Sequence, residues 1–197
     1  MKIILGSSSP RRREILRFFS LPFMQQSPDV DERQVIFDGS PERYVSTVAK
    51  EKAESLQKKF PDQVILTADT IVYCNNRIYH KPETESQAIK MLSDLSGSWH
   101  QVFTGVCVQK NALFYSQAEE TKVLLHPLSE QQIRAYFQRF SFADKAGGYA
   151  IQEGGAIVVK KIEGCPYNVW GLPISTMREL LLKVGIDLWD YLKSTSI

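Results

Sequence analysis

The chain has 197 residues, 43% of them hydrophobic, and its 24 basic and 22 acidic side chains leave a net charge of +2. A chain of this length can bury one sizeable core, so we expect a single domain over residues 1–197. The near-neutral charge argues against nucleic acid or a membrane surface as a partner, and no run approaches the ~20 apolar residues of a membrane span.

Strand-like and helix-like segments alternate along the chain, which indicates an α/β or mixed α+β fold. The first strand is expected at residues 2–5 and the first helix at residues 10–20, where Ser9 suits the N-cap and Pro10 the first helical position. The other expected elements are strands at residues 63–68, 71–74, 77–79, 101–110, 113–124 and 156–163, and helices at residues 40–60, 84–95, 129–140 and 173–184.

Three arginines, Arg11, Arg12 and Arg13, occupy the first turn of the first expected helix. The helix dipole disfavours cations there by roughly 0.3–1 kcal/mol each. One interpretation is a solvated helix start with ion pairs to nearby glutamates. The other, which we favour, is a phosphate site at which Arg11 and Arg12 share an anion with free N–H groups and serine hydroxyls. Residues advance by about 100° around a helix, so this arrangement leaves Arg13 to solvent.

Asp69 follows the apolar residues 63–68 and is expected at the end of a buried strand. A carboxylate there either caps the following turn or faces a crevice at the carboxyl end of the sheet, and its position favours the crevice. Lys52 lies four residues from both Val48 and Leu56, on the apolar face of its helix. It either extends to the surface or turns its ammonium into an anion pocket, and the spacing leaves both open.

Other charged residues lie in expected loops. Lys81 and the pair Asp144-Lys145 are, taken singly, typical of surface charges, and the acidic residues 29–32 are typical of a solvated loop that also offers hard oxygen ligands for Mg²⁺. The histidines have no metal-binding spacing, and no Walker A, HExxH, GxSxG or GxGxxG pattern is present. Cations and carboxylates without a nucleophile motif suit a polyphosphate substrate, a divalent metal and a water nucleophile.

The three cysteines lie far apart, at Cys74, Cys107 and Cys165, and indicate neither a zinc site nor a disulfide framework. Only three apolar residues precede the first polar turn, which is too short for a signal peptide. We therefore expect a cytoplasmic protein.

In their order along the chain, these motifs resemble the Maf family of nucleoside triphosphate pyrophosphatases. The resemblance covers nearly the whole sequence. The matching stretches are SSSPRR at 7–12, DVDER at 29–33, AKEKA at 49–53, ADTIV at 68–72, HKP at 80–82, LSG at 95–97, HQVFTGV at 100–106, DKAGGYAIQ at 144–152 and NVWGLP at 168–173.

The resemblance implies an elongated α/β fold, with a mixed β-sheet, flanking helices and two lobes around a nucleotide-binding cleft. It also implies a homodimer and hydrolysis of a nucleoside triphosphate to the monophosphate and pyrophosphate with a divalent cation, Mg²⁺ or Mn²⁺. Gly148 and Ala150 depart from the family pattern DKAGAYGIQ, and because alanine tolerates positive φ poorly, they predict a different backbone path beside the base. Trp170 replaces a smaller residue.

Residue by residue, the resemblance also implies roles. Asp69 matches the catalytic acidic residue and Glu32 the second acidic position, and the two are the expected metal ligands. The residues that match phosphate-contacting positions are Ser7, Arg12, Lys52 and Lys81. The residues that match the dTTP- and UTP-hydrolysing branch are Arg11, Thr70 and Gln152.

We expect a pyrophosphatase that hydrolyses dTTP and UTP and removes non-standard nucleotides from the pool. Two alternatives stay open: a related pyrophosphatase for a different nucleotide, with a modified or purine base, and a non-catalytic nucleotide-binding regulator of cell division.

Overall fold

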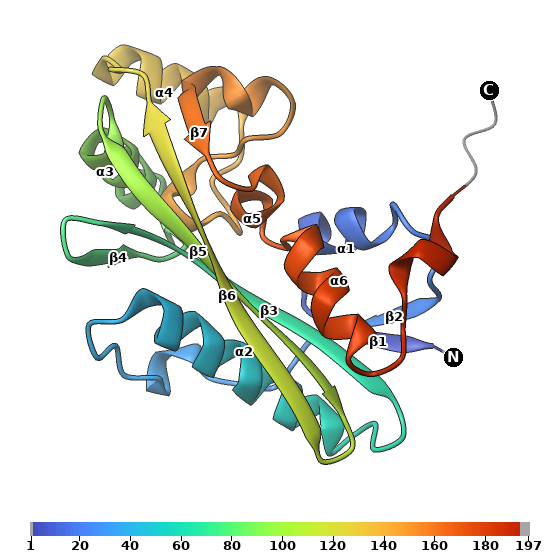
Figure 1. Cartoon of the computed structure of the whole chain (residues 1–197). Helices are drawn as coiled ribbons and strands as arrows, with labels where there is room; N and C mark the ends of the chain where they lie inside the picture. Colours follow the sequence, from blue (N-terminus) through green and yellow to red (C-terminus); the bar gives the residue numbers. More distant parts are fainter. Residues whose placement is uncertain (1, 194–197) are drawn as a thin grey trace.

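The computed structural model describes residues 2–193, in which helices flank a seven-stranded mixed sheet (Figure 1). The strand order is β2-β1-β3-β5-β6-β7, and β4 pairs with β3. The strands are β1 (Ile3–Gly6), β2 (Phe23–Gln26), β3 (Val64–Cys74), β4 (Arg77–Tyr79), β5 (Trp99–Lys110), β6 (Leu113–Leu125) and β7 (Val159–Glu163). The α-helices are α1 (Pro10–Leu16), α2 (Pro41–Gln57), α3 (Glu85–Leu95), α4 (Glu130–Arg139), α5 (Pro166–Trp170) and α6 (Ile174–Leu182). The expected mixed α/β fold is confirmed.

The central strands are covered on both faces, and alternate side chains enter different cores. Ile3 and Leu5 of β1 belong to the core that includes residues of α1 and α6. Ile4, between them, packs with Ala49 and Ala53 of α2. This is why the strands read as continuous apolar runs in the sequence.

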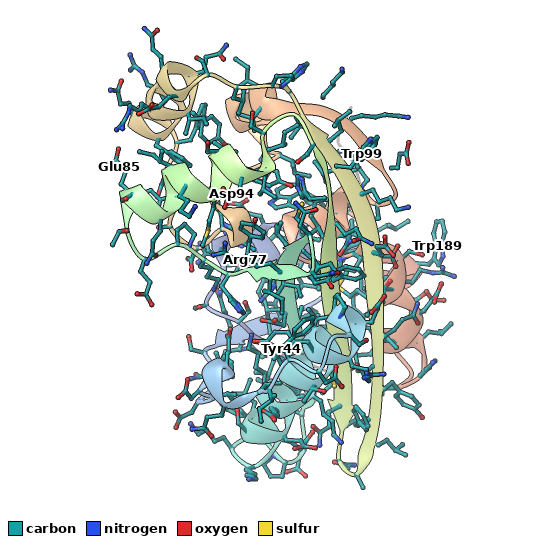
Figure 2. All side chains as sticks on the ribbon, turned by 90° about the vertical axis from the view of Figure 1, so that its left-hand side faces the viewer. Tyr44, Arg77, Glu85, Asp94, Trp99 and Trp189 are labelled. Atoms are coloured by element: carbon teal, nitrogen blue, oxygen red, sulfur yellow. The ribbon has the colours of Figure 1, made fainter. Side chains whose placement is uncertain are left out.

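A separate core lies at the other end of the sheet, where α3, α4 and β7 gather (Figure 1). The hairpin of β5 and β6 runs the length of the molecule and joins the two ends. Its turn has Asn111 at φ 55°, a left-handed conformation that asparagine tolerates. Trp99 on β5 and Trp189 near the C-terminus stand at the surface (Figure 2). Within residues 2–193 no helix has the length and apolarity needed to cross a membrane.

Helix starts follow the sequence signals more closely than helix ends do. Ser129 and Gln132 form a reciprocal capping box at the start of α4, where the helix of residues 129–140 was expected to begin. By contrast, α1 ends at Leu16 although it was expected to reach residue 20. The helix ends early because the residues after it pair with the C-terminal segment. The N–H of Ser20 donates to the carbonyl of Tyr191 at 2.7 Å. Likewise, residues 156–158 belong to the 3₁₀ helix Glu153–Val158, so β7 begins later than expected.

The expectation that Asp69 ends a buried strand is wrong, because β5 pairs with β3 without a break from Val64 to Tyr73. On its opposite edge, β3 pairs with β1 over residues 64–67 and with β4 over residues 72–74. Within the described chain, residues 68–71 therefore have a strand neighbour on one side only. The crevice expected beside Asp69 lies along this open edge, just past the end of β1.

Candidate active site

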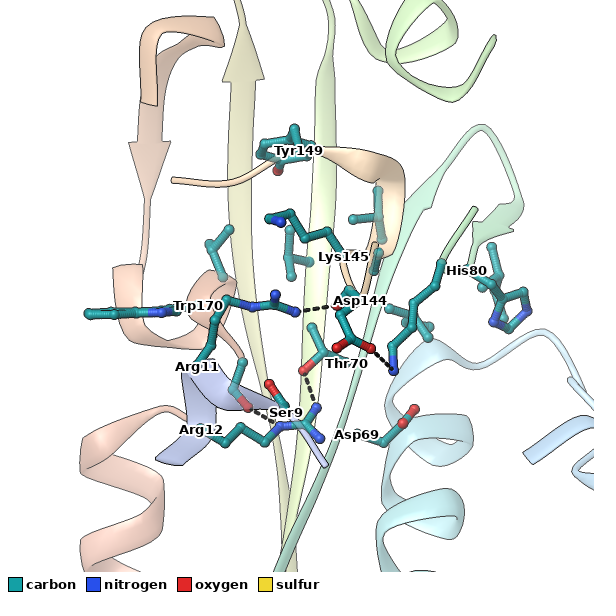
Figure 3. A pocket seen from close by; sticks show the side chains of 18 of the residues that line it. Ser9, Arg11, Arg12, Asp69, Thr70, His80, Asp144, Lys145, Tyr149 and Trp170 are labelled. Carbon is teal, nitrogen blue, oxygen red and sulfur yellow. Dashed lines mark hydrogen bonds and ion pairs between the residues drawn. The ribbon is translucent and has the colours of Figure 1, made fainter. Parts of the chain in front are cut away.

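The open edge of β3 borders a cavity of about 430 Å³ (Figure 3). Seven of the residues expected in the site line it: Arg11, Arg12, Glu32, Asp69, Thr70, Lys81 and Gln152. The other two, Ser7 and Lys52, lie behind the wall, where each contacts a lining side chain. Segments from residue 7 to residue 171 thus converge on one cavity.

Arg12 crosses the floor of the cavity and is held on three sides. Its Nε donates to the carbonyl of Gly171 at 2.8 Å, and its two terminal nitrogens donate to Ser7 Oγ at 3.2 Å and to Thr70 Oγ1 at 3.0 Å. All three acceptors are neutral. Burial lowers the pKa of Arg12 and Asp69 opposes that shift, but a guanidinium stays charged in proteins. The bonds therefore orient the charge without neutralising it.

The other two arginines of α1 differ from each other. Arg11 lines the cavity and donates a hydrogen bond to the carbonyl of Asp144 across it (Figure 3). Arg13 does not line the cavity, as predicted. The expectation that Arg13 faces solvent is wrong in part, however, because the side chain is half-buried and its Nε is enclosed with no hydrogen-bond partner in the described part of the chain.

Lys52 turns inward and joins two carboxylates. Its Nζ lies 2.7 Å from Asp69 Oδ1 and 2.7 Å from Glu32 Oε1. Lys52 and Asp69 are 5% and 6% exposed, so the helix face that carries Lys52 points it into the site and not to the surface. Burial by itself would raise the pKa of Asp69, but the cations Lys52 and Arg12 together hold that pKa below its ordinary value. Asp69 is therefore ionised near neutral pH.

Asp144 is a site residue that was interpreted from the sequence as part of a surface pair. It lines the cavity, and its Oδ1 lies 3.5 Å from Lys81 Nζ. Its φ of 64° is unusual for a residue with a side chain. Lys145, beside it, also lines the cavity, and burial followed by repulsion from Arg11 lowers the pKa of its ammonium. The sequence signals were the glycine-rich stretch that these residues open and the match of residues 144–152 to the family pattern.

The charges around the cavity do not balance. The five cations are Arg11, Arg12, Lys52, Lys81 and Lys145, and the three carboxylates are Glu32, Asp69 and Asp144. Five minus three leaves an excess of two positive charges around a small, partly enclosed volume. Such an arrangement favours a multiply charged anion.

Gln152 lines the cavity from the loop of residues 144–152. Gly147 and Gly148 of this loop have positive φ, whereas Ala150 is not among the described residues that do. The sequence departure at Gly148 and Ala150 is thus accommodated without strain at the alanine. Thr70 shares a hydrogen bond with Thr104 Oγ1 at 2.9 Å, which fixes its hydroxyl near Arg12.

Over residues 2–193, no group of three or more His, Cys, Asp or Glu side chains is arranged to hold a metal ion. Asp69 and Glu32 nevertheless place two carboxylates around one ammonium. Magnesium is commonly held by one or two carboxylates together with substrate phosphates and water. The donor set therefore fits a divalent cation that arrives with a phosphate substrate.

The family model described as Maf-like protein matches residues 2–184. A dTTP/UTP pyrophosphatase of Chlamydia trachomatis serovar L2 is 42% identical over 192 residues, which cover 97% of this chain and 98% of that protein. A dTTP/UTP pyrophosphatase of Chlamydia caviae is 45% identical with the same coverage. The solved structure of a nucleoside-triphosphatase / dITP/XTP pyrophosphatase from Mycobacterium abscessus is similar with a TM-score of 0.41 and 13% identity, over 64% of this chain and 74% of that one.

Proposed function

The chain belongs to the Maf family, and from that premise we propose that it hydrolyses dTTP and UTP to the nucleoside monophosphate and pyrophosphate. The observation that carries the proposal is the cavity in which four cations, Arg11, Arg12, Lys81 and Lys145, accompany the Asp69–Lys52–Glu32 cluster. A triphosphate that arrives with a divalent cation is an anion of the kind that this excess charge attracts.

The triphosphate is held by the cations on both sides of the cavity. Arg12 offers a preoriented planar guanidinium, which suits phosphate oxygens. Arg11 and Lys81 face it from α1 and from the loop after β4, and both are engaged with Asp144 in the structure. Phosphate oxygens compete with the Asp144 carbonyl for Arg11 and with the Asp144 carboxylate for Lys81, so binding exchanges these contacts for contacts with phosphate.

Asp69 and Glu32 are the residues that would hold a divalent cation, Mg²⁺ or Mn²⁺. When bound, such an ion neutralises phosphate charge and lowers the pKa of coordinated water. Lys52 holds the two carboxylates close together and helps to keep the pKa of Asp69 below its ordinary value, so the pair is in place for a cation before the substrate enters.

The chemical step is attack of water on the α-phosphorus. The new bond joins the water oxygen to this phosphorus, and the bond from phosphorus to the bridging oxygen breaks, so that pyrophosphate leaves. Asp69 accepts a hydrogen bond from the attacking water and orients it. Because the pKa of Asp69 lies below its ordinary value, the proton is not retained by Asp69 but passes to solvent.

The base is read by Gln152, whereas the hydroxyl of Thr70 is bonded to Arg12 and Thr104 and supports the phosphate-binding arginine. Uracil and thymine present an acceptor, donor, acceptor edge, and one amide side chain matches two neighbouring positions of that edge. Cytosine presents the reverse pattern, an acceptor at N3 and a donor at the exocyclic amine. In the orientation that pairs with uracil, the Gln152 amide therefore places acceptor against acceptor and donor against donor. An unpaired buried polar group costs roughly 1–3 kcal/mol, which corresponds to about ten- to a hundredfold discrimination.

We also propose that the enzyme acts in the cytoplasm as a homodimer, with a nucleotide as substrate and without nucleic acid or membrane as partner. Free thiols at all three cysteines fit a reducing compartment. The homodimer rests on the family resemblance alone.

The test is pyrophosphate release from a panel of nucleoside triphosphates with Mg²⁺ or Mn²⁺. We expect dTTP and UTP to be turned over fastest. A purine or modified base preferred over both would support the first alternative, and no turnover of any nucleotide would support a binding regulator. In ¹⁸O-labelled water the label should enter the monophosphate. Label in the pyrophosphate would mean attack at the β-phosphorus and would overturn the chemical step.

A further inference from the structure

Tyr136 lies on α4, a helix that does not line the cavity, but its hydroxyl reaches the segment that carries Gln152. The phenol oxygen accepts a hydrogen bond from the N–H of Ala150 at 3.0 Å and donates to the carbonyl of Gly155 at 3.4 Å. These partners stand two residues before and three residues after Gln152. The tyrosine is 5% exposed, so water does not replace these bonds.

The same segment is closed by a backbone bond and by tight packing. The N–H of Gly155 donates to the carbonyl of Gln152 at 3.1 Å. A Cβ at Gly155 would lie 3.1 Å from the methyl group of Ala150 and 3.3 Å from the Tyr136 hydroxyl. The turn that presents Gln152 is therefore folded around this hydroxyl, with little free space.

We infer that Tyr136 is a positioning residue for base selection, which acts by fixing the backbone on both sides of Gln152. The inference rests on the proposed function, since it concerns how the base is read. Tyr136 does not line the cavity, and the two hydrogen bonds of its hydroxyl go to the segment that carries Gln152, away from Arg12 and Asp69 in the sequence. An amide that reads two neighbouring atoms of a base needs a fixed orientation, because hydrogen bonds weaken steeply when misaligned.

The test compares Tyr136→Phe with the wild type and with Tyr73→Phe, a matched control whose hydroxyl bonds Asn76 in an exposed hairpin turn. The readouts are kcat/KM for UTP and for CTP, and inhibition by inorganic tripolyphosphate, which reports the phosphate end alone. In Tyr136→Phe the ratio of UTP to CTP should fall at least about fivefold, the effect of roughly one neutral hydrogen bond. Tripolyphosphate inhibition should stay within about twofold in both variants.

A purely structural role predicts that UTP and CTP activities fall by one common factor, and that result would overturn the inference. An unchanged ratio would overturn it as well. In a Gln152→Glu background the further change Tyr136→Phe should leave the ratio where it is, because the group that it positions is gone. If Tyr136→Phe does not fold, Gly155→Ala is the second variant. Its added methyl group would crowd Ala150 and the Tyr136 hydroxyl in the same turn and should lower the ratio of UTP to CTP activity. A wild-type enzyme that turns over no nucleotide, or that does not distinguish UTP from CTP, would refute the proposed function itself.

Discussion

Lys52 of α2 and Asp69 of β3 form a buried ion pair, with Nζ 2.7 Å from Oδ1. Removing two charges from water costs several kcal/mol per ion, and their mutual attraction repays this only when the geometry is good and further hydrogen bonds are made. The second contact, from Lys52 to Glu32, supplies part of that compensation. Because the ammonium serves two carboxylates, the loss of Lys52 and the loss of Asp69 have unequal consequences.

Lys52→Met keeps most of the length of the unbranched side chain but removes its charge, which leaves Asp69 buried without its nearest cation. We expect the free energy of unfolding to fall by about 3 kcal/mol. Urea denaturation at pH 7 measures it. The matched control is Lys50→Met on the same helix, whose exposed pair with Glu54 at 3.6 Å should be worth less than about 0.5 kcal/mol. Equal losses in the two variants would contradict a structural role for the buried pair.

Asp69→Asn removes the carboxylate while Lys52 keeps Glu32 as a partner. The fold should therefore be less affected than in Lys52→Met, whereas kcat for dTTP should fall at least about a hundredfold, which corresponds to ~2.7 kcal/mol of the activation barrier. Asp94→Asn, on α3 and outside the cavity lining, is the control and should keep full activity. Retention of more than about a tenth of the wild-type kcat would remove Asp69 from the principal catalytic role.

Arg12→Lys retains the positive charge but loses the planar fork that reaches Gly171, Thr70 and Ser7 together. A lysine cannot reproduce that arrangement, so we expect KM for dTTP to rise about tenfold or more. Arg13→Lys, one residue along the same helix and outside the cavity lining, should change KM less than about twofold. The measurement is the steady-state KM of both variants for dTTP. Similar KM values in the two variants would contradict the assignment of Arg12, and not Arg13, to triphosphate binding.

His100 makes folding stability depend on pH. It is 2% exposed, and burial lowers its pKa from 6.5 to about 4. Between these two values the unfolded chain binds a proton that the folded chain does not, so the stabilising contribution of the neutral ring is complete above pH 6.5 and is lost as the pH falls towards 4. The free energy of unfolding of the wild type should fall between pH 7 and pH 4.5. In His100→Gln, which lacks the buried imidazole, that fall should be about 2 kcal/mol smaller. Urea titrations at both pH values test this, with the exposed His126→Gln as a control that should keep the wild-type difference.

Local signals predicted much of this fold. The capping box at Ser129 and the asparagine at the hairpin turn act within a few residues, and the elements that they delimit, the helix from residue 129 and the strands on either side of residue 111, were predicted close to where they lie. The apolar face of α2 also placed Lys52 correctly, although spacing alone left the direction of its ammonium open. Its position facing Asp69 follows from the packing of α2 on β3.

What the sequence could not provide is the pairing of distant segments. β3 was split at Asp69 because a charged residue inside a buried run resembles a strand end, and the burial of this carboxylate is compensated by Lys52 and Arg12, which come from other segments. Asp144 looked like a surface charge because its partners, Arg11 and Lys81, come from segments far away in the sequence. The contacts of the Tyr136 hydroxyl could not be predicted either, because its partners, Ala150 and Gly155, lie 14 and 19 positions further along the chain.

The bond from Arg12 to the carbonyl of Gly171 spans 159 positions. Contacts of such large sequence separation carry a high loop-closure cost and are characteristic of slow steps in folding. During synthesis the floor of the cavity therefore stays open until the segment of Gly171 has left the ribosome and docked. A growing chain can therefore form the hairpin of β5 and β6 before the bond that fixes Arg12 in the cavity can exist.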